Sequence, residues 1–124
     1  MSVLLLTIDT LRPDYLSLNG YDRATSPFLD DFLADAFQFS RAITPIARTT
    51  PALASLLTGA YPHTTGVRTL TDSLSDEVTS IAEVFREAGY QTVAVVTNNV
   101  LKPERRLDRG FDVYDMERDI RTAP

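Results

Sequence analysis

The chain has 124 residues and a mass of 13.8 kDa, the size of about one domain. Hydrophobic residues make up 44% and charged residues 23%, which excludes a disordered tail, a collagen-like repeat and a coiled coil. The formal net charge of −5 disfavours nucleic acid and anionic membranes as partners. Since there is no cysteine, disulfides, thiolate metal sites and cysteine nucleophiles are also excluded.

The first apolar run predicts a buried strand. Val3–Ile8 has the length and composition of a strand that is covered on both faces of a parallel sheet, and Asp9 ends it. Within this run, Val3–Leu6 has neither the basic leader nor the length of a signal peptide. No segment has the length of a membrane span, so the sequence predicts a cytoplasmic protein.

A proline marks the next helix start. Ser26-Pro27 combines a capping hydroxyl with a proline in the first turn, and the apolar spacing after it predicts a helix over 27–36. A short strand over Phe37–Ile43 is expected to follow.

The same pattern returns at Thr49-Thr50-Pro51. The almost wholly apolar stretch after it predicts a short buried helix over Ala52–Thr58, which Gly59 ends. A loop is expected over residues 60–75.

A third helix is expected to be capped by Asp76 and to end before Gly89. Its predicted inward face consists of Val78, Ile81, Ala82, Val84, Phe85 and Ala88. The expected elements after it are a second buried strand over Val93–Val96, a charged loop over 98–110, a short strand over 111–114 and a solvated end over 117–124. Because strands alternate with helices, the predicted fold is an α/β sandwich with a parallel sheet and right-handed crossovers.

Asp9 is the first candidate for chemistry. Sites in open parallel sheets lie beyond the carboxyl ends of the strands, and a carboxylate there is well placed to bind a hard divalent cation. The same position fits an acid of a nucleotide-binding fold, or an aspartate that caps the chain structurally.

Thr49 and Thr50 are the second candidates. A helix N-terminus favours anions, and a hydroxyl there could attack phosphorus or sulfur. The alternative is that one of these threonines is simply the helix cap.

The other polar residues have plainer explanations. His63, the only histidine, is expected to lie in a turn or at a substrate rim. The scattered glycines form neither a dinucleotide fingerprint nor a P-loop. Solvated or turn positions are expected for Asp30, Asp31, Arg48, Asp108, Arg109 and Asp112, although Arg48, just before the two threonines, could also face an anion.

Five segments resemble the sulfatases and their relatives in the alkaline phosphatase superfamily, in family order. They are Leu5–Asp14 (LLTIDTLRPD), Thr25–Asp30 (TSPFLD), Thr49–Val67 (TTPALASLLTGAYPHTTGV), Glu87–Thr92 (EAGYQT) and Gly110–Asp115 (GFDVYD). Together they cover most of residues 3–115. The third segment is similar to the sulfatase active-site signature.

The resemblance implies an α/β enzyme that cleaves sulfate or phosphate esters with a metal-bound nucleophile at a helix start. Asp9 matches the family's first metal-ligand aspartate, and Thr49 matches the nucleophile. A divalent cation (calcium, magnesium, manganese or zinc) and a small anionic ester are therefore expected to bind. Family catalytic domains are several times longer, so residues 1–124 are expected to be the amino-terminal part of an incomplete catalytic domain, and inactive alone.

Several positions depart from the family pattern. Thr10 replaces a frequent second aspartate, and Leu53 replaces the arginine of the motif that directs formylglycine formation. Threonine at position 49 occurs in relatives that handle phosphate esters. Thr97 and Asn99 replace a lysine and a histidine that often follow the fourth segment.

Two interpretations follow from this pattern. The leading one is a sulfatase-like, metal-dependent ester hydrolase; the alternative is a non-catalytic sulfatase-like module for anion binding or assembly, which Leu53, Thr97 and Asn99 favour. An unrelated nucleotide-binding domain is disfavoured, because the chain has no glycine-rich phosphate loop. An incomplete α/β layer exposes sheet or helix surface, so self-association is also expected.

Overall fold

The computed structural model describes residues 1–116, and the predicted solvated end over 117–124 lies outside these residues. The chain divides into two compact units, residues 1–43 and the residues from Thr44 onwards. Within residues 1–116, no helix combines the length and the apolar character that a bilayer span needs.

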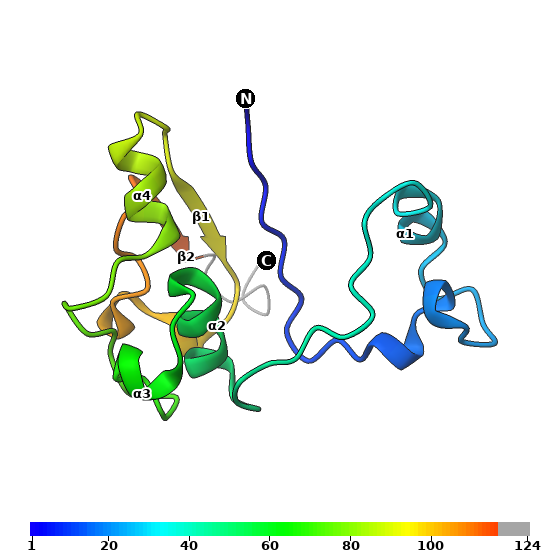
Figure 1. The fold of residues 1–124 in the computed structure, drawn as a ribbon, viewed down its shortest axis with the longest axis horizontal. Coiled ribbons are helices and arrows are strands. Elements are labelled where there is room, and N and C mark those ends of the chain that lie inside the picture. The colour runs from blue at the N-terminus through cyan, green and yellow to red at the C-terminus, as the bar shows by residue number, and fades with distance from the viewer. Residues whose placement is uncertain (117–124) are drawn as a thin grey trace, which may run out of the picture. The chain divides into compact units, whose positions relative to one another are not determined.

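The second unit contains a two-stranded parallel sheet. Strand β1, Val93–Val96, lies beside β2, Val113–Met116 (Figure 1). The register of the pair places Val93 opposite Val113. This confirms the predicted second strand, and the last strand lies two residues further on than expected. The predicted burial of β1 is wrong for one face, because Val93 and Val95 keep 53% and 68% of their surface exposed. One face of the sheet is therefore open within this unit.

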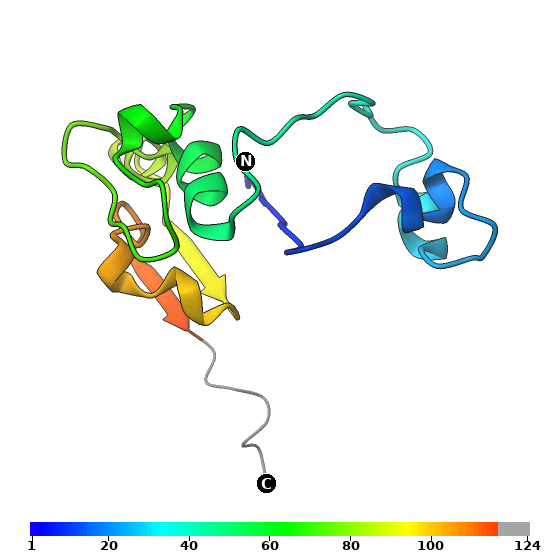
Figure 2. The same ribbon diagram turned by 90° about the horizontal axis from the view of Figure 1, so that it is seen from below.

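Helix α2, Thr49–Thr58, is the most buried helix of the second unit. Its inward residues are Thr50, Pro51, Ala54 and Ser55. It begins three residues earlier than predicted and ends at Gly59, whose positive φ of 67° lets the backbone turn out of the helix. The short helix α3, Pro62–Thr65, packs against it (Figure 2).

Helix α4, Ile81–Glu87, begins at a different cap from the predicted one. The Ser80 hydroxyl accepts from the backbone N–H of Glu83, and the Glu83 carboxylate accepts from the backbone N–H of Ser80. This reciprocal capping box replaces Asp76, because it satisfies both backbone groups within one turn. The predicted inward face is only partly right: Ala82 is buried, whereas Ile81 and Val84 are 45% and 54% exposed.

The core of the second unit gathers residues from α2 and from the loops around it. Two 3₁₀ turns, η3 (Asn99–Leu101) and η4 (Pro103–Arg105), lie in the connection from β1 to β2 (Figure 2). The buried core residues are Ala54, Val67, Leu74, Leu101 and Leu107. Because η3 follows β1 directly and packs against α2, this core fixes the start of α2 near the carboxyl end of β1.

The first unit is built around a polar contact between two short elements, η2 (Ser17–Asn19) and α1 (Pro27–Phe32). The Ser17 and Ser26 hydroxyls both donate to the Asp30 carboxylate, at 2.6 and 2.8 Å. Ser26 is the N-cap residue, but its side chain makes no capping bond to the backbone. Asp30, expected on a solvated face, instead joins the two elements, with a further 3₁₀ turn, η1 (Pro13–Tyr15), just before them.

Three predictions for the first unit are wrong. Val3–Ile8 and Phe37–Ile43 form no strand, and α1 ends at Phe32 instead of residue 36. Most large side chains of both segments are exposed, Phe37 at 99%. A strand exists only through backbone bonds to a neighbouring strand, and neither segment has such a neighbour among the described residues.

Candidate functional site

The candidate site of the second unit is the first turn of α2. Thr49 is the first helical residue and is half-buried, while Arg48 before it has extended backbone (φ −145°, ψ 138°) and makes no side-chain capping bond. Neither threonine is therefore the N-cap. Pro51 fits the first turn, because its missing N–H would have no partner inside the helix. The aligned peptide dipoles make this turn favourable for negative charge.

Thr50 ties this turn to two distant segments. Its side chain is fully buried, and its hydroxyl donates to the carbonyl oxygens of Leu70 (3.2 Å) and Val100 (3.4 Å). Val100 lies in η3, which follows the carboxyl end of β1. The start of α2 is thus held at the edge of the parallel strands where sites of such sheets occur. The sequence alone indicates Thr50 only as a possible cap or nucleophile, and not as a residue that anchors the turn.

Asp9 lies in the first unit, in an exposed turn after the extended run at the N-terminus. Its carboxylate accepts from the Thr10 hydroxyl at 3.4 Å. Thr10 has φ of 61°, in the left-handed region that β-branched residues rarely adopt. The carboxylate itself is a hard oxygen donor of the kind that divalent cations bind.

The described residues do not assemble a complete cation site. Asp9 belongs to the first unit and Thr49 to the second. No group of three or more His, Asp or Glu side chains within residues 1–116 could hold a metal ion. The donor chemistry of the Asp9 carboxylate fits a hard cation, but one carboxylate supplies fewer ligands than the six to eight or so that Mg²⁺ and Ca²⁺ take.

The departures from the family pattern have different structural settings. Leu53 is half-buried and packs against the core, so an apolar side chain suits this position of α2. Thr97 and Asn99 are exposed, and they lie directly after β1, on the segment to which Thr50 is bonded. His63 is exposed in α3, where its ring stacks on Tyr61 at 5.9 Å, in keeping with a turn or rim residue.

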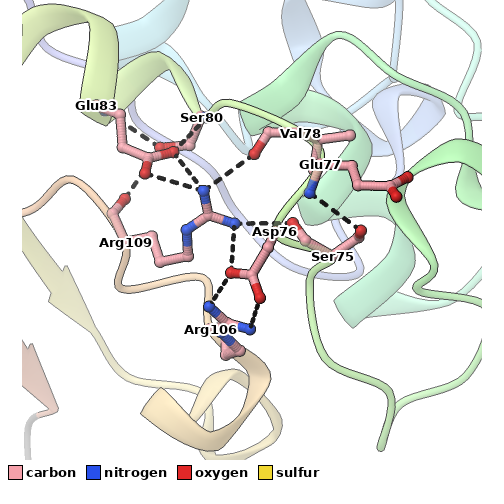
Figure 3. A network of polar contacts seen from close by, with 8 residues as sticks. All are labelled: Ser75, Asp76, Glu77, Val78, Ser80, Glu83, Arg106 and Arg109. Carbon is pink, nitrogen blue, oxygen red and sulfur yellow. Dashed lines mark hydrogen bonds and ion pairs between the residues drawn. The ribbon is translucent and has the colours of Figure 1, made fainter.

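Arg109 is more than the turn residue expected from the sequence. Its guanidinium donates to the backbone carbonyls of Ser75 (2.8 Å) and Val78 (3.1 Å) and to the Glu83 carboxylate (3.0 Å), as Figure 3 shows. Asp76 lies beside it and pairs with Arg106. Burial raises the pKa of Glu83, but the hydrogen bonds from Ser80 and Arg109 outweigh this effect and leave that pKa below its ordinary value. The network is a structural support for α4.

Two of the matched motifs meet at the start of the sheet. The backbone N–H and the hydroxyl of Thr92 both donate to the Asp112 carboxylate, at 2.9 and 3.1 Å, and the hydroxyl also lies 2.7 Å from the Gly110 carbonyl. The pair stands one residue before the register pair Val93 and Val113. Thr92 and Asp112 therefore fix how the two strands align. Their role is to stabilise the sheet.

The sequence carries a signal for one of the contacts that it did not predict, and none for the other. Ser80-x-x-Glu83 is a capping-box pattern, and it could have been preferred to Asp76. The partners of Thr50 are backbone carbonyls 20 and 50 residues away, which no side-chain pattern encodes.

Comparison with known proteins identifies the family. The Sulfatase family model matches residues 2–121. The chain is 34% identical over 91 residues to a ulvan-active sulfatase of Formosa agariphila, covering 73% of this chain and 18% of that protein. It is 31% identical over 107 residues to an arylsulfatase of Clostridium perfringens, covering 86% of this chain and 22% of that protein.

A solved structure shows the same fold. The phosphonate monoester hydrolase of Agrobacterium radiobacter superimposes with a TM-score of 0.67 at 23% identity, over 83% of this chain and 23% of that one. The chain thus spans about a fifth of the length of the curated relatives it matches. Its α/β architecture is that of the alkaline phosphatase and sulfatase type. The chain belongs to the sulfatase family.

Proposed function

We propose that the protein is a hydrolase of sulfate or phosphate esters in which the Thr49 hydroxyl is the nucleophile. The observation that carries this proposal is the position of Thr49 at the start of α2, beside Thr50, whose hydroxyl is bonded to the segment after the carboxyl end of β1. Family membership supports the reaction class.

The proposed reaction at the first turn of α2 is a nucleophilic displacement. Thr49 Oγ1 attacks sulfur or phosphorus, the bond to the ester oxygen breaks with its electron pair, and the departing oxygen takes up the proton that the hydroxyl loses. Water later releases the bound group from Thr49. Negative charge on the transferred group is stabilised by the partial positive charge at the start of α2. Thr49 as a residue is half-buried.

A divalent cation is part of the proposal, and calcium, magnesium, manganese and zinc remain the candidates. Asp9 is the residue of this chain that we propose as a ligand of the cation. A cation that contacts the nucleophile would lower the pKa of its hydroxyl and stabilise developing negative charge. Since the described residues offer no cluster of three ligands, we propose that the remaining ligands come from outside residues 1–116 and that this piece is inactive alone.

Leu53 favours a second candidate, a non-catalytic sulfatase-like module that binds an anion or a partner protein. It packs on the core where the family motif has an arginine. A module of this kind would keep the fold, stabilised by residues such as Thr92 and Asp112, without turning over an ester.

The two candidates are separated by turnover and by metal dependence in the full-length protein. The hydrolase should cleave at least one of a panel of 4-nitrophenyl sulfate, phosphate and phosphonate esters, lose this activity on chelation, and regain it with one added cation. Absence of turnover across the panel, together with a melting temperature that added cations do not raise, would favour the binding module.

A further inference from the structure

The Thr50 hydroxyl makes an unusual pair of long-range contacts. The side chain is completely buried, and its oxygen lies 3.2 Å from the Leu70 carbonyl and 3.4 Å from the Val100 carbonyl. A hydroxyl carries one proton, so it can donate to either carbonyl or share the proton between the two. The first turn of α2 is thereby joined to the loop after α3 and to η3 at once.

The first turn of α2 has no ordinary side-chain cap. Arg48 makes no side-chain bond to the first turn of α2, and Pro51 supplies no N–H. The turn is instead held sideways, by a buried hydroxyl, against the segment that leaves the carboxyl end of β1. The Thr50 hydroxyl therefore adds a polar contact to the packing of α2 and Val100 against the core.

We propose that Thr50 is a positioning residue, which fixes where Thr49 Oγ1 lies at the carboxyl end of β1 without touching the substrate itself. The inference rests on the proposed role of Thr49 as nucleophile. Thr50 follows Thr49 directly on the backbone, so a shift of the turn moves both residues. A misplacement of about 1 Å can lower the rate of an oriented reaction about 100-fold.

The test compares two substitutions at Thr50 in the full-length enzyme. Thr50→Val keeps the shape of the side chain and removes the donor, and Thr50→Ser keeps the donor and removes a methyl group. Thr50→Val should lower kcat about 10- to 100-fold with KM changed less than about twofold, because an interaction that orients the nucleophile is lost while substrate binding is kept. Thr50→Ser should restore most of the lost kcat.

Ser55→Ala is the matched control. Ser55 is a buried hydroxyl residue of the same helix, and its Oγ has no hydrogen-bond partner within the described part of the chain. Its replacement should leave kcat and KM unchanged. If Thr50→Val fails to fold, Thr50→Cys takes its place, because a thiol is a similar but weaker donor. The kcat of Thr50→Cys should then lie below that of Thr50→Ser and above that of the inactive Thr49→Ala.

The outcomes separate the inference from the proposed function. Normal kcat in Thr50→Val, or equal loss in Thr50→Val and Thr50→Ser, would overturn the positioning role while Thr49→Ala still abolishes turnover. Retained turnover in Thr49→Ala would instead overturn the proposed function. A loss of kcat in Thr50→Val that Thr50→Ser restores, with Thr49→Ala inactive, supports both.

Discussion

Replacing Gly110 with alanine should destabilise the second unit much more than the same change at Gly89. Both glycines have positive φ, 88° and 84°. A Cβ at Gly89 would meet no atom within 4 Å, whereas a Cβ at Gly110 would lie 2.2 Å from the backbone nitrogen of Glu83 and 2.6 Å from the carbonyl carbon of Ala82. The two variants share the conformational strain and differ in the collision.

The expected magnitudes follow from these contacts. The left-handed backbone alone costs a non-glycine residue about 1–2 kcal/mol, which is the effect expected at Gly89. Crowding a packed site adds about 1–3 kcal/mol at Gly110, because the atoms it meets are backbone and cannot move aside freely. The Glu83 nitrogen is also the donor to the Ser80 hydroxyl, so the clash falls on the cap of α4. A loss of about 2–5 kcal/mol is predicted for Gly110→Ala.

Hydrogen exchange in the full-length protein, followed by mass spectrometry of peptides that cover α4 and the sheet, measures these losses locally. Protection of the backbone amides of α4 should fall far more in Gly110→Ala than in Gly89→Ala. Equal losses of amide protection in the two variants would refute the close approach of Gly110 to the first turn of α4. They would also contradict the contacts described between Arg109 and α4.

Three further perturbations test the polar contacts. The folded-state pKa of Glu83 lies below its ordinary 4.5, so ionised Glu83 stabilises the fold above that pH, and this stabilisation is lost as the pH falls. Glu83→Gln should therefore lower the melting temperature at neutral pH. It should also make the melting temperature fall less steeply towards acid pH. Burial raises the pKa of Tyr114 from 10.0 to about 12, so the neutral phenol, bonded to the Leu101 carbonyl at 2.7 Å, stabilises the fold below pH 10.0 and this contribution is lost towards the raised value. Tyr114→Phe should therefore flatten the alkaline limb of the same profile. Asp30→Ala should leave two serine hydroxyls without their shared acceptor and make residues 13–33 more sensitive to limited proteolysis than in the full-length parent protein. Unchanged cleavage would contradict the role given to this contact.

The sequence predicted the elements of the second unit well, because local rules determine them. The hydroxyl-proline start and Gly59 predicted α2, and the apolar run at Val93–Val96 predicted β1. It predicted the first unit poorly. An apolar run such as Val3–Ile8 indicates that a segment favours burial, but the strand itself needs backbone partners, and none of the described residues supplies them.

The sequence predicted the residues of the candidate site but not the contacts that hold them in place. Thr49 follows from the helix start and from the family motif, but the anchoring role of Thr50 depends on carbonyl groups that the fold brings close. Asp112 was expected to be a turn residue because short polar side chains are common there, and its bond to Thr92 became visible only once the strands were paired.

The most direct test of the proposal is kcat/KM for the full-length protein with Thr49 replaced by alanine, measured on the ester that the parent enzyme cleaves best. Thr64→Ala, at a hydroxyl residue of α3, is the control. If Thr49 is the nucleophile, Thr49→Ala should lower kcat/KM by at least about 1,000-fold while Thr64→Ala leaves it unchanged. A Thr49→Ala enzyme within about tenfold of the parent would contradict the account.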